Sequence, residues 1–274
     1  MDSQITYNGG ADGDGAVRCT DWLDAIVCGD CLIEMPKIPA QSVDAIISDL
    51  PYGTTACKWD SVIPFASLWS EWKRLLKPNG VVVLTASQPF TSALVMSNPT
   101  WFRYELIWRK NTGSGFAYAK HQPMRYHESV LVFSNWRGTY NPQRAERFSE
   151  ASKRMCRNPI RGGGKKTSEH APMNIVMVQY DSETKGPESV LEFKSVPNSG
   201  GGKLHPTQKP AELMRYLVRT YTNPGDAILD PCCGSGTTCL AAMQEGRHYI
   251  GIEKETNYAE ITKQRIYEAR GLGV

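Results

Sequence analysis

The sequence predicts an α/β fold in which a mostly parallel sheet carries helices on both faces. Short, continuous apolar runs indicate strands that are buried on both sides, as in parallel sheets. They are interspersed with stretches of helical apolar spacing, for example at residues 63–76 and 210–221. Acidic or glycine-rich turns follow several of the runs, and ligands of parallel sheets gather at these carboxyl ends. We therefore expect one ligand site along one edge of the sheet.

The chain begins with a polar segment and then continues as predicted strands and helices. Residues 1–18 are rich in Gly, Asp and Asn, and we interpret them as a flexible N-terminal arm. Strands are expected at residues 25–28, 43–48, 81–85, 104–108, 129–134, 227–229 and 249–253. Helices are expected at residues 63–76, 89–97, 210–221, 238–245 and 258–269. Residues 111–125 form a mixed loop that either only connects two strands or borders the site.

Bulk composition limits the class of protein. The 274 residues carry a formal net charge of +3, so any nucleic-acid surface must be local. Eight cysteines would be compatible with disulfides, but no signal peptide or membrane-spanning run is visible, so a reducing, cytoplasmic setting is expected. Cys28 and Cys31 have zinc-like spacing, but no second pair or His partner stands at a matching interval. Small core residues are the favoured interpretation, and no metal is predicted.

One segment, residues 137–204, lacks a regular apolar pattern. Up to residue 170 it holds nine Lys and Arg against three Glu, a local excess of six that exceeds the charge of the whole chain. Composition alone favours a solvated loop. Glycine clusters at 162–164 and 200–202 suggest mobility. Its cations are equally suited to phosphate contacts if the rest of the chain acts on nucleic acid.

The turn at residues 230–237, Asp-Pro-Cys-Cys-Gly-Ser-Gly-Thr, is the most informative local motif. It follows a predicted strand and precedes a predicted helix. Gly234 and Gly236 allow backbone angles closed to other residues and let a ligand approach the main chain at the helix N-terminus. The next strand ends in Glu253, spaced like the acid that binds ribose hydroxyls in dinucleotide folds. By itself such a turn is equally an ordinary chain reversal.

Two further motifs accompany this turn: Asp-Leu-Pro-Tyr at 49–52 and His-Pro-Thr-Gln-Lys-Pro at 205–210. Together the three resemble the β group of S-adenosylmethionine-dependent DNA amino-methyltransferases, over most of residues 24–268. The resemblance implies a Rossmann-like methyltransferase fold with a seven-stranded sheet and a circularly permuted motif order. It divides the chain into the arm (1–18), a catalytic half (19–136), an inserted target-recognition segment (137–204) and a cofactor-binding half (205–274).

The resemblance also assigns binding residues. Glu253 would accept hydrogen bonds from the ribose hydroxyls of S-adenosylmethionine and Asp30 from its adenine amine, whereas Lys209 is equally interpretable as a surface lysine. The predicted cofactor-binding residues are Asp30, Cys31, Asp49, Thr207, Lys209, Asp230, Cys232, Gly234, Ser235, Gly236, Thr237 and Glu253. Cys232 and Cys233 replace a Phe and a variable residue of the family, so looser packing is expected there. The predicted contacts to double-stranded DNA are Arg144, Arg147, Lys153, Arg154, Arg157, Arg161, Lys165 and Lys166.

Asp49, Leu50, Pro51 and Tyr52 are the predicted catalytic residues. An exocyclic amine is a poor nucleophile because its lone pair is delocalised into the ring. The Asp49 carboxylate and the Leu50 carbonyl would accept its two hydrogens, Pro51 would stiffen the turn, and Tyr52 would stack on a flipped base. Leu50 departs from the family's commoner Pro, which predicts a less rigid turn. Taken alone, the tetrapeptide would be better explained as a capped turn with a half-buried Tyr, and its two companion motifs reverse that preference.

The resemblance favours adenine N6 as the target, because Asp at position 49 is more typical of adenine enzymes and Ser of cytosine-N4 enzymes. Cytosine-N4 methylation stays open. So does a catalytically silent DNA-binding subunit, although the motif residues argue against it. A homodimer and a restriction endonuclease partner are compatible with the resemblance, and the residues decide neither.

Overall fold

The computed structural model describes residues 19–55, 57, 60–146, 184–197 and 203–271. The chain divides into a larger compact unit, residues 1–141 with 189–274, and a smaller one, residues 142–188. In the smaller unit, β6 (Ala145–Glu146) pairs antiparallel with β7 (Thr184–Lys185). The predicted arm, residues 1–18, and most of the predicted insertion lie outside the described residues.

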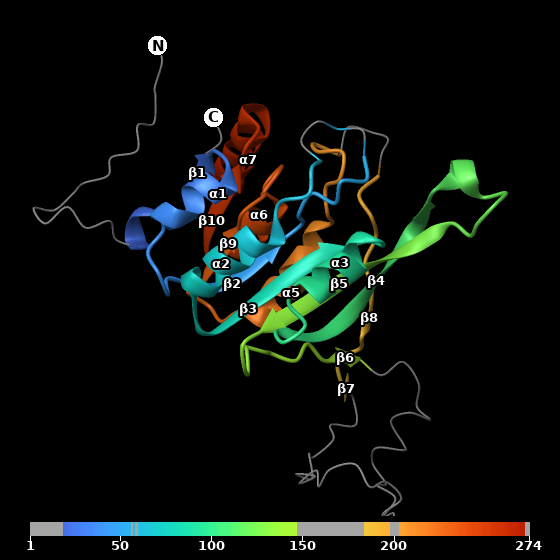
Figure 1. Ribbon diagram of the computed structural model, residues 1–274, viewed down its shortest axis with the longest axis horizontal. Helices are drawn as coiled ribbons and strands as arrows, with labels where there is room; N and C mark the ends of the chain where they lie inside the picture. Colours follow the sequence, from blue (N-terminus) through green and yellow to red (C-terminus); the bar gives the residue numbers. More distant parts are fainter. Residues whose placement is uncertain (1–18, 56, 58–59, 147–183, 198–202, 272–274) are drawn as a thin grey trace, which may run out of the picture. The chain divides into compact units, whose positions relative to one another are not determined.

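Among the described residues, the larger unit is built on an eight-stranded sheet with the order β1-β10-β9-β2-β3-β5-β4-β8 (Figure 1). The strands are β1 (Ala25–Cys28), β2 (Val43–Ser48), β3 (Leu76–Ala86), β4 (Phe102–Ser114), β5 (Arg125–Ser134), β8 (Val190–Glu192), β9 (Ala227–Asp230) and β10 (His248–Glu253). Only β5, among these eight, runs against its neighbours β3 and β4. The α/β class and the mostly parallel sheet are therefore confirmed. The predicted count of seven strands was one short, because β8 has three residues inside a segment without apolar periodicity.

Helices cover both faces of this sheet. Alternate residues of β2 point to opposite faces: Ile46 packs with α2 and α3, whereas Ile47 packs with α5 and α6. Both apolar clusters are buried, as continuous apolar strands require. The helices are α1 (Cys31–Glu34), α2 (Phe65–Leu75), α3 (Phe90–Ser97), α5 (Ala211–Tyr221), α6 (Thr237–Gln244) and α7 (Thr256–Ala269). Short 3-10 turns occur at η1 (Cys19–Asp21), η2 (Met35–Lys37) and η3 (Phe116–Tyr118). Within the described residues, no helix is long and apolar enough to cross a bilayer.

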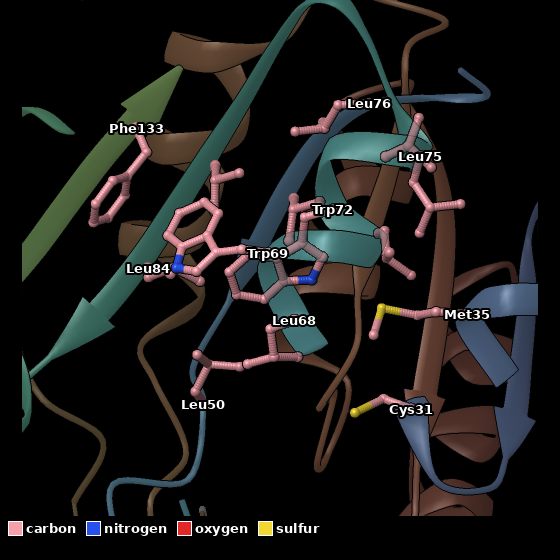
Figure 2. Close-up of a cluster of buried hydrophobic side chains, with 14 of the residues drawn as sticks. Cys31, Met35, Leu50, Leu68, Trp69, Trp72, Leu75, Leu76, Leu84 and Phe133 are labelled. Atoms are coloured by element: carbon pink, nitrogen blue, oxygen red, sulfur yellow. The ribbon is translucent and has the colours of Figure 1, made fainter. Parts of the chain in front are cut away.

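Aromatic residues of α2 anchor one face of the sheet. Figure 2 shows Trp69 and Trp72 of α2 beside Leu84 of β3 and Phe133 of β5. The Trp69 ring lies 5.0 Å from Trp72 and 5.1 Å from Phe133, both edge to face. Its indole nitrogen donates to the Ser97 hydroxyl of α3 at 2.8 Å. This cluster packs α2, which the apolar spacing of residues 63–76 predicted, against β2 and β3. The packing thereby also holds the turn that follows β2.

The strand order explains how a permuted chain builds one site. β1 pairs with β10, from the opposite end of the chain, and β9 pairs with β2. All four strands run parallel, so their carboxyl ends meet at one edge. Asp230 and Glu253 are the last residues of β9 and β10, and Asp30 and Asp49 follow β1 and β2, so all four acids lie at that edge. The prediction that these four acids share one edge is confirmed.

The region between the two middle strands differs from the expected loop. Residues 111–125 were predicted as a mixed loop, but β4 runs on to Ser114 and β5 begins at Arg125. The two strands form a long antiparallel hairpin with η3 at its tip, and Figure 1 shows it extending past the other strands. The outer part of β4 was not recognised as a strand because it faces no core, so its residues are mostly polar and show no apolar alternation.

Candidate active site

A cavity of about 740 Å³ opens at the carboxyl edge of the larger unit. Small-molecule sites typically enclose roughly 300 to 1,000 Å³, so the volume suits a nucleoside-sized cofactor with space for part of a substrate. Both the glycine turn and the Asp-Leu-Pro-Tyr turn contribute to its wall. Of the residues predicted for cofactor binding or catalysis, only Gly236 is absent from the wall. The structure therefore brings the two motifs together.

One end of the cavity, which we call the cofactor end, contains the glycine turn. This turn is hydrogen-bonded to the end of β10. Gly234 adopts a positive φ of 53° and its N–H donates to Glu253 Oε2 at 2.8 Å. The other carboxylate oxygen accepts from the Glu255 N–H at 2.8 Å. Burial raises the pKa of Glu253, while the backbone donors partly oppose that rise. The Lys254 N–H is a third backbone donor, and the remaining acceptor capacity of the carboxylate is available to a hydroxyl in the cavity.

Gly236 has a structural role that the sequence did not reveal. Its φ is 75°, and an added Cβ would lie 2.3 Å from Thr262 Cγ2 of α7. The Thr262 hydroxyl donates to the Gly234 carbonyl at 2.8 Å. Arg265 Nη1 of the same helix lies 3.4 Å from the hydroxyls of Ser235 and Thr237. Gly236 thus allows α7 to clamp the turn from behind, and the cavity wall is made by its neighbours.

Two more acids complete this end. Asp230 is 3% exposed, and its Oδ1 accepts from the Ser48 hydroxyl at 2.6 Å and from the Cys232 N–H at 3.2 Å. Burial raises the pKa of Asp230 to about 6, because the hydrogen bonds offset only part of the desolvation. Asp30 caps α1 through the Leu32 N–H at 3.0 Å, and its second oxygen lies 3.1 Å from Lys254 Nζ. Both carboxylates face the cavity with acceptor capacity left over.

The cysteines of this region pack in pairs. A hydrogen bond between Cys31 and Cys232 lowers the pKa of the first thiol and raises that of the second. Cys233 is buried and hydrogen-bonds to Cys239, which together with burial raises the pKa of Cys233. Each of the two turn cysteines thus has a thiol partner from another part of the chain, and the looser packing expected from the sequence stays a prediction. Nowhere among the described residues do three or more His, Cys, Asp or Glu gather as a metal site.

The other end of the cavity, which we call the target end, contains Asp49. Asp49 follows β2 and accepts three side-chain hydrogen bonds. Its Oδ1 accepts from the Tyr52 hydroxyl at 2.6 Å and from the Thr85 hydroxyl. Its Oδ2 accepts from Lys209 Nζ at 2.6 Å. Burial and the Asp49 charge raise the pKa of Tyr52, so its hydroxyl remains a donor. The carboxylate is therefore fixed by residues from three separate parts of the chain.

Lys209 belongs to a buried chain of alternating charges. Its side chain is 8% exposed and its Nζ lies 3.5 Å from Glu128 Oε2, while Lys110 Nζ lies 3.1 Å from Glu128 Oε1. Burial alone would lower the pKa of Lys209, but Asp49 and Glu128 outweigh it and raise the pKa. The two lysines in turn outweigh burial and lower the pKa of Glu128. Lys209 was predicted to bind the cofactor, but its structural partners are the acids Asp49 and Glu128, and the cofactor contact stays a prediction.

Apolar contacts hold the Asp-Leu-Pro-Tyr turn itself. Leu50 is 3% exposed and joins the cluster beneath α2 (Figure 2). The Tyr52 ring stacks on Phe90 with centroids 5.0 Å apart, and Lys209 Nζ lies 5.5 Å from its centre. Just beyond, Asp60 accepts from the backbone N–H groups of Gly53, Thr54 and Thr55 at 2.6 to 2.9 Å. Leu50 thus anchors the turn by burial where the sequence had predicted less rigidity.

The predicted DNA contacts lie almost entirely outside the described residues. Arg144 is exposed in the smaller unit. The residues that cannot be placed are Arg147, Lys153, Arg154, Arg157, Arg161, Lys165 and Lys166. Their role stays a prediction.

Comparison with known proteins now decides the family. A protein-family model described as DNA methylase, for N6 and N4 methyltransferases, matches residues 43–264. The chain belongs to this family. S-adenosylmethionine is the methyl donor of the family, and the acids and glycine main chain at the cofactor end fit its ribose, amine and ammonium groups. The predicted family and cofactor are confirmed.

Relatives agree with the assignment to this DNA methyltransferase family. The type II methyltransferase M.HinfI of Haemophilus influenzae is 27% identical over 91% of this chain and 70% of its own. The DNA adenine methyltransferase YhdJ of Escherichia coli is 28% identical over 88% of this chain and 82% of its own. The M1.HpyAVI–SAM complex shares the fold, with a TM-score of 0.58, 24% identity and coverage of 88% of this chain and 98% of that one.

Sequence reasoning missed Thr85, Lys110 and Glu128, all of which lie at the target end. Thr85 ends a predicted strand whose other residues are apolar. Only the fold shows that its hydroxyl faces Asp49. Lys110 and Glu128 carried a usable signal: each is a charged residue beside a predicted apolar strand, and the two strands are neighbours in the sheet. Opposite charges at such positions commonly pair.

Proposed function

We propose that this DNA methyltransferase transfers a methyl group to the N6 amine of adenine in double-stranded DNA, after the target base leaves the helix. The observation that supports this most is the Asp49 carboxylate, held at the wall of the cavity that also contains the glycine turn. A duplex base cannot reach an acceptor in such a cavity without extrusion. Adenine is favoured by Asp at position 49 and by the similarity to an adenine methyltransferase.

The hydrogen bonds of Asp49 leave capacity for the target amine. A carboxylate offers about four lone-pair directions, two on each oxygen. Within the described part of the chain, Tyr52 and Thr85 take both directions of Oδ1, and Lys209 takes one of Oδ2. One direction of Oδ2 is left for an amine hydrogen. The Leu50 carbonyl then accepts the second hydrogen, which directs the nitrogen lone pair toward the cofactor end.

The remaining residues position these acceptors. Tyr52 is held by Asp49 and Phe90, so its ring offers the flipped base a stacking surface whose orientation is already fixed. Asp60 holds the chain after Tyr52 and thereby limits the movement of the turn. S-adenosylmethionine supplies the electrophilic methyl group at the other end of the cavity. Asp49 need only accept a hydrogen bond, since the amine loses its proton to solvent after methyl transfer.

Nucleoside mass spectrometry tests the proposal. The protein is incubated with isotope-labelled S-adenosylmethionine and mixed bacterial DNA, and the DNA is digested to nucleosides. Labelled N6-methyladenine is the expected product. Labelled N4-methylcytosine would show the alternative base specificity, and binding of cofactor and DNA without a labelled nucleoside would support a silent subunit. The predicted cytoplasmic location, homodimer and restriction endonuclease partner are not needed for this activity and remain predictions.

A further inference from the structure

The tip of the β4–β5 hairpin exposes aromatic side chains that the fold does not use. Residues 114–123 are all exposed, and Phe116 and Tyr118 of η3 are 82% and 62% exposed. Tyr126, on the returning strand, is 48% exposed. Large apolar groups gathered on a protruding element usually mark a binding surface. The tip therefore presents a candidate contact with a partner.

Its backbone is nevertheless well defined. Gly115, at a φ of 87°, turns the chain without a clash, and the Tyr118 N–H donates to its carbonyl at 2.9 Å. The N–H groups of His121 and Gln122 donate to the Tyr118 carbonyl at 2.8 and 3.0 Å. The aromatic rings are thus presented on a closed turn, so little order has to be gained when they bind.

Charge points to a polyanion as the partner. Residues 109–127 contain four Lys and Arg and no Asp or Glu, a net charge of +4 in a chain whose total is +3. Near the base, Arg109 pairs with Glu192 at 2.9 Å and Lys110 with Glu128. Toward the tip, Lys120 is exposed and Arg125 donates to the Ser87 hydroxyl at 2.5 Å, neither with an acidic partner among the described residues. The outer half of the hairpin therefore has uncompensated positive charge.

Position ties this surface to the active site. Residues 110–114, which lead from the base of the hairpin to its tip, line the same cavity as Asp49. Gly113 lets the Tyr126 ring approach closely, since an added Cβ would lie 2.7 Å from that ring. A duplex placed with one base in the cavity must pass near this wall, and a two-stranded ribbon is narrow enough to enter a DNA groove.

We propose that the β4–β5 hairpin is a DNA-contacting wedge, in which Phe116 and Tyr118 stack in the gap left by the flipped base and Lys120 contacts a phosphate. This inference rests on the proposed function and adds an element outside the predicted insertion. Apolar and aromatic wedges of this kind stabilise opened base steps. The wedge lowers the cost of opening the duplex and does not touch the reacting amine.

The test compares hairpin variants on closed and pre-opened DNA. Phe116→Ala/Tyr118→Ala is assayed on a short duplex containing a site that the wild type methylates, and on the same duplex with an abasic site opposite the target base. We expect a loss of about 10- to 100-fold on the closed duplex, the range of lost base stacking, and near-wild-type rates on the opened duplex. Tyr267→Ala, an exposed tyrosine of α7, serves as the matched control and keeps both rates.

Salt dependence tests the charge. Lys120→Gln should reduce the slope of log affinity against log salt by about 0.9, the contribution of one phosphate contact. Lys263→Gln, a lysine of α7 that pairs with Glu260, should leave the slope unchanged. Binding is followed by fluorescence anisotropy of a labelled duplex.

Three outcomes would overturn the wedge: full activity of the aromatic variant on closed DNA, equal losses on closed and opened DNA, or an unchanged salt slope for Lys120→Gln. A change in sedimentation with unaltered DNA binding would show instead that the tip joins two copies of the chain. A wild type that methylates no DNA would contradict the proposed function. The anisotropy experiment would then still decide whether the hairpin binds DNA.

Discussion

The two ends of the cavity are built by different means. At the cofactor end, Glu253 and Asp30 are held by backbone N–H groups, and Gly234 is held by the end of the next strand. At the target end, Asp49 is held by side chains alone, from Tyr52, Thr85 and Lys209. Backbone donors cannot leave without unfolding the turn, whereas side chains rotate. We conclude that the cofactor end is preformed and that the target end can adjust when a base enters.

Removing the Asp49 carboxylate should have the largest effect on the methylation rate. Asp49→Ala should lower the single-turnover methylation rate by about 100- to 1,000-fold, the usual effect of losing one group that stabilises charge at the reacting atoms. Asp49→Asn keeps one acceptor oxygen and should lose less. The measurement is rapid-quench methylation with saturating cofactor. Equal rates for Asp49→Ala and the wild type would remove Asp49 from the mechanism.

Lys209→Met tests whether the target end depends on its ion pairs. The substitution leaves Asp49 without a cationic partner among the described residues and Glu128 with Lys110 alone, so the free energy of unfolding at pH 7 should fall by about 3 kcal/mol. Lys209 and Lys110 lower the pKa of Glu128, so this stabilisation is present above pH 4.5 and is lost as the pH falls. The difference from wild type should therefore shrink toward pH 4.

Urea unfolding from pH 4 to 8 measures this effect. Lys263→Met, which removes an exposed pair on α7, is the control and should change stability by under about 1 kcal/mol. A Lys209→Met protein as stable as wild type at pH 7 would mean that the ion pairs are not needed to hold Asp49.

Asp230→Asn examines the cofactor end through pH. Burial raises the pKa of Asp230 from 3.8 to about 6, so its ionisation costs the folded, cofactor-free protein roughly 3 kcal/mol at most. For a raised pKa, stability is full below 3.8 and is lost as the pH rises through 6. The variant cannot ionise and keeps the acceptor for Ser48. It should be more stable than wild type at pH 8 and equal at pH 4, by thermal unfolding without cofactor.

Comparing Gly236→Ala with Gly246→Ala separates the stability cost of a steric clash from that of backbone strain. Both glycines have positive φ, 75° and 70°, but an added Cβ meets Thr262 at 2.3 Å in the first and nothing within 4 Å in the second. Backbone strain alone costs about 1 kcal/mol. Gly236→Ala should lose about 1 to 3 kcal/mol more, because α7 must shift. Equal melting temperatures would show that α7 does not clamp the turn.

The same contrast explains what the sequence could predict. Gly234 and Glu253 are recognisable because backbone geometry and strand ends impose residue types at fixed spacing. Asp49 was found through its neighbours in one short motif. Thr85 and Glu128 belong to no such motif. They lie 36 and 79 positions from Asp49 in the sequence, and only the folded sheet brings them near it. Residues 111–125 of the hairpin were predicted as a loop because they face no apolar core and therefore show no apolar pattern.

One calorimetric experiment tests whether the two ends of the cavity act separately. S-adenosylmethionine is titrated into the wild type, Asp49→Ala and Glu253→Gln, each first checked for folding by circular dichroism. We predict an unchanged dissociation constant for Asp49→Ala and a weakening of about tenfold or more for Glu253→Gln, since a charged acceptor is lost. If Asp49→Ala weakens cofactor binding as much as Glu253→Gln does, the cavity is one coupled site and its two ends do not act separately.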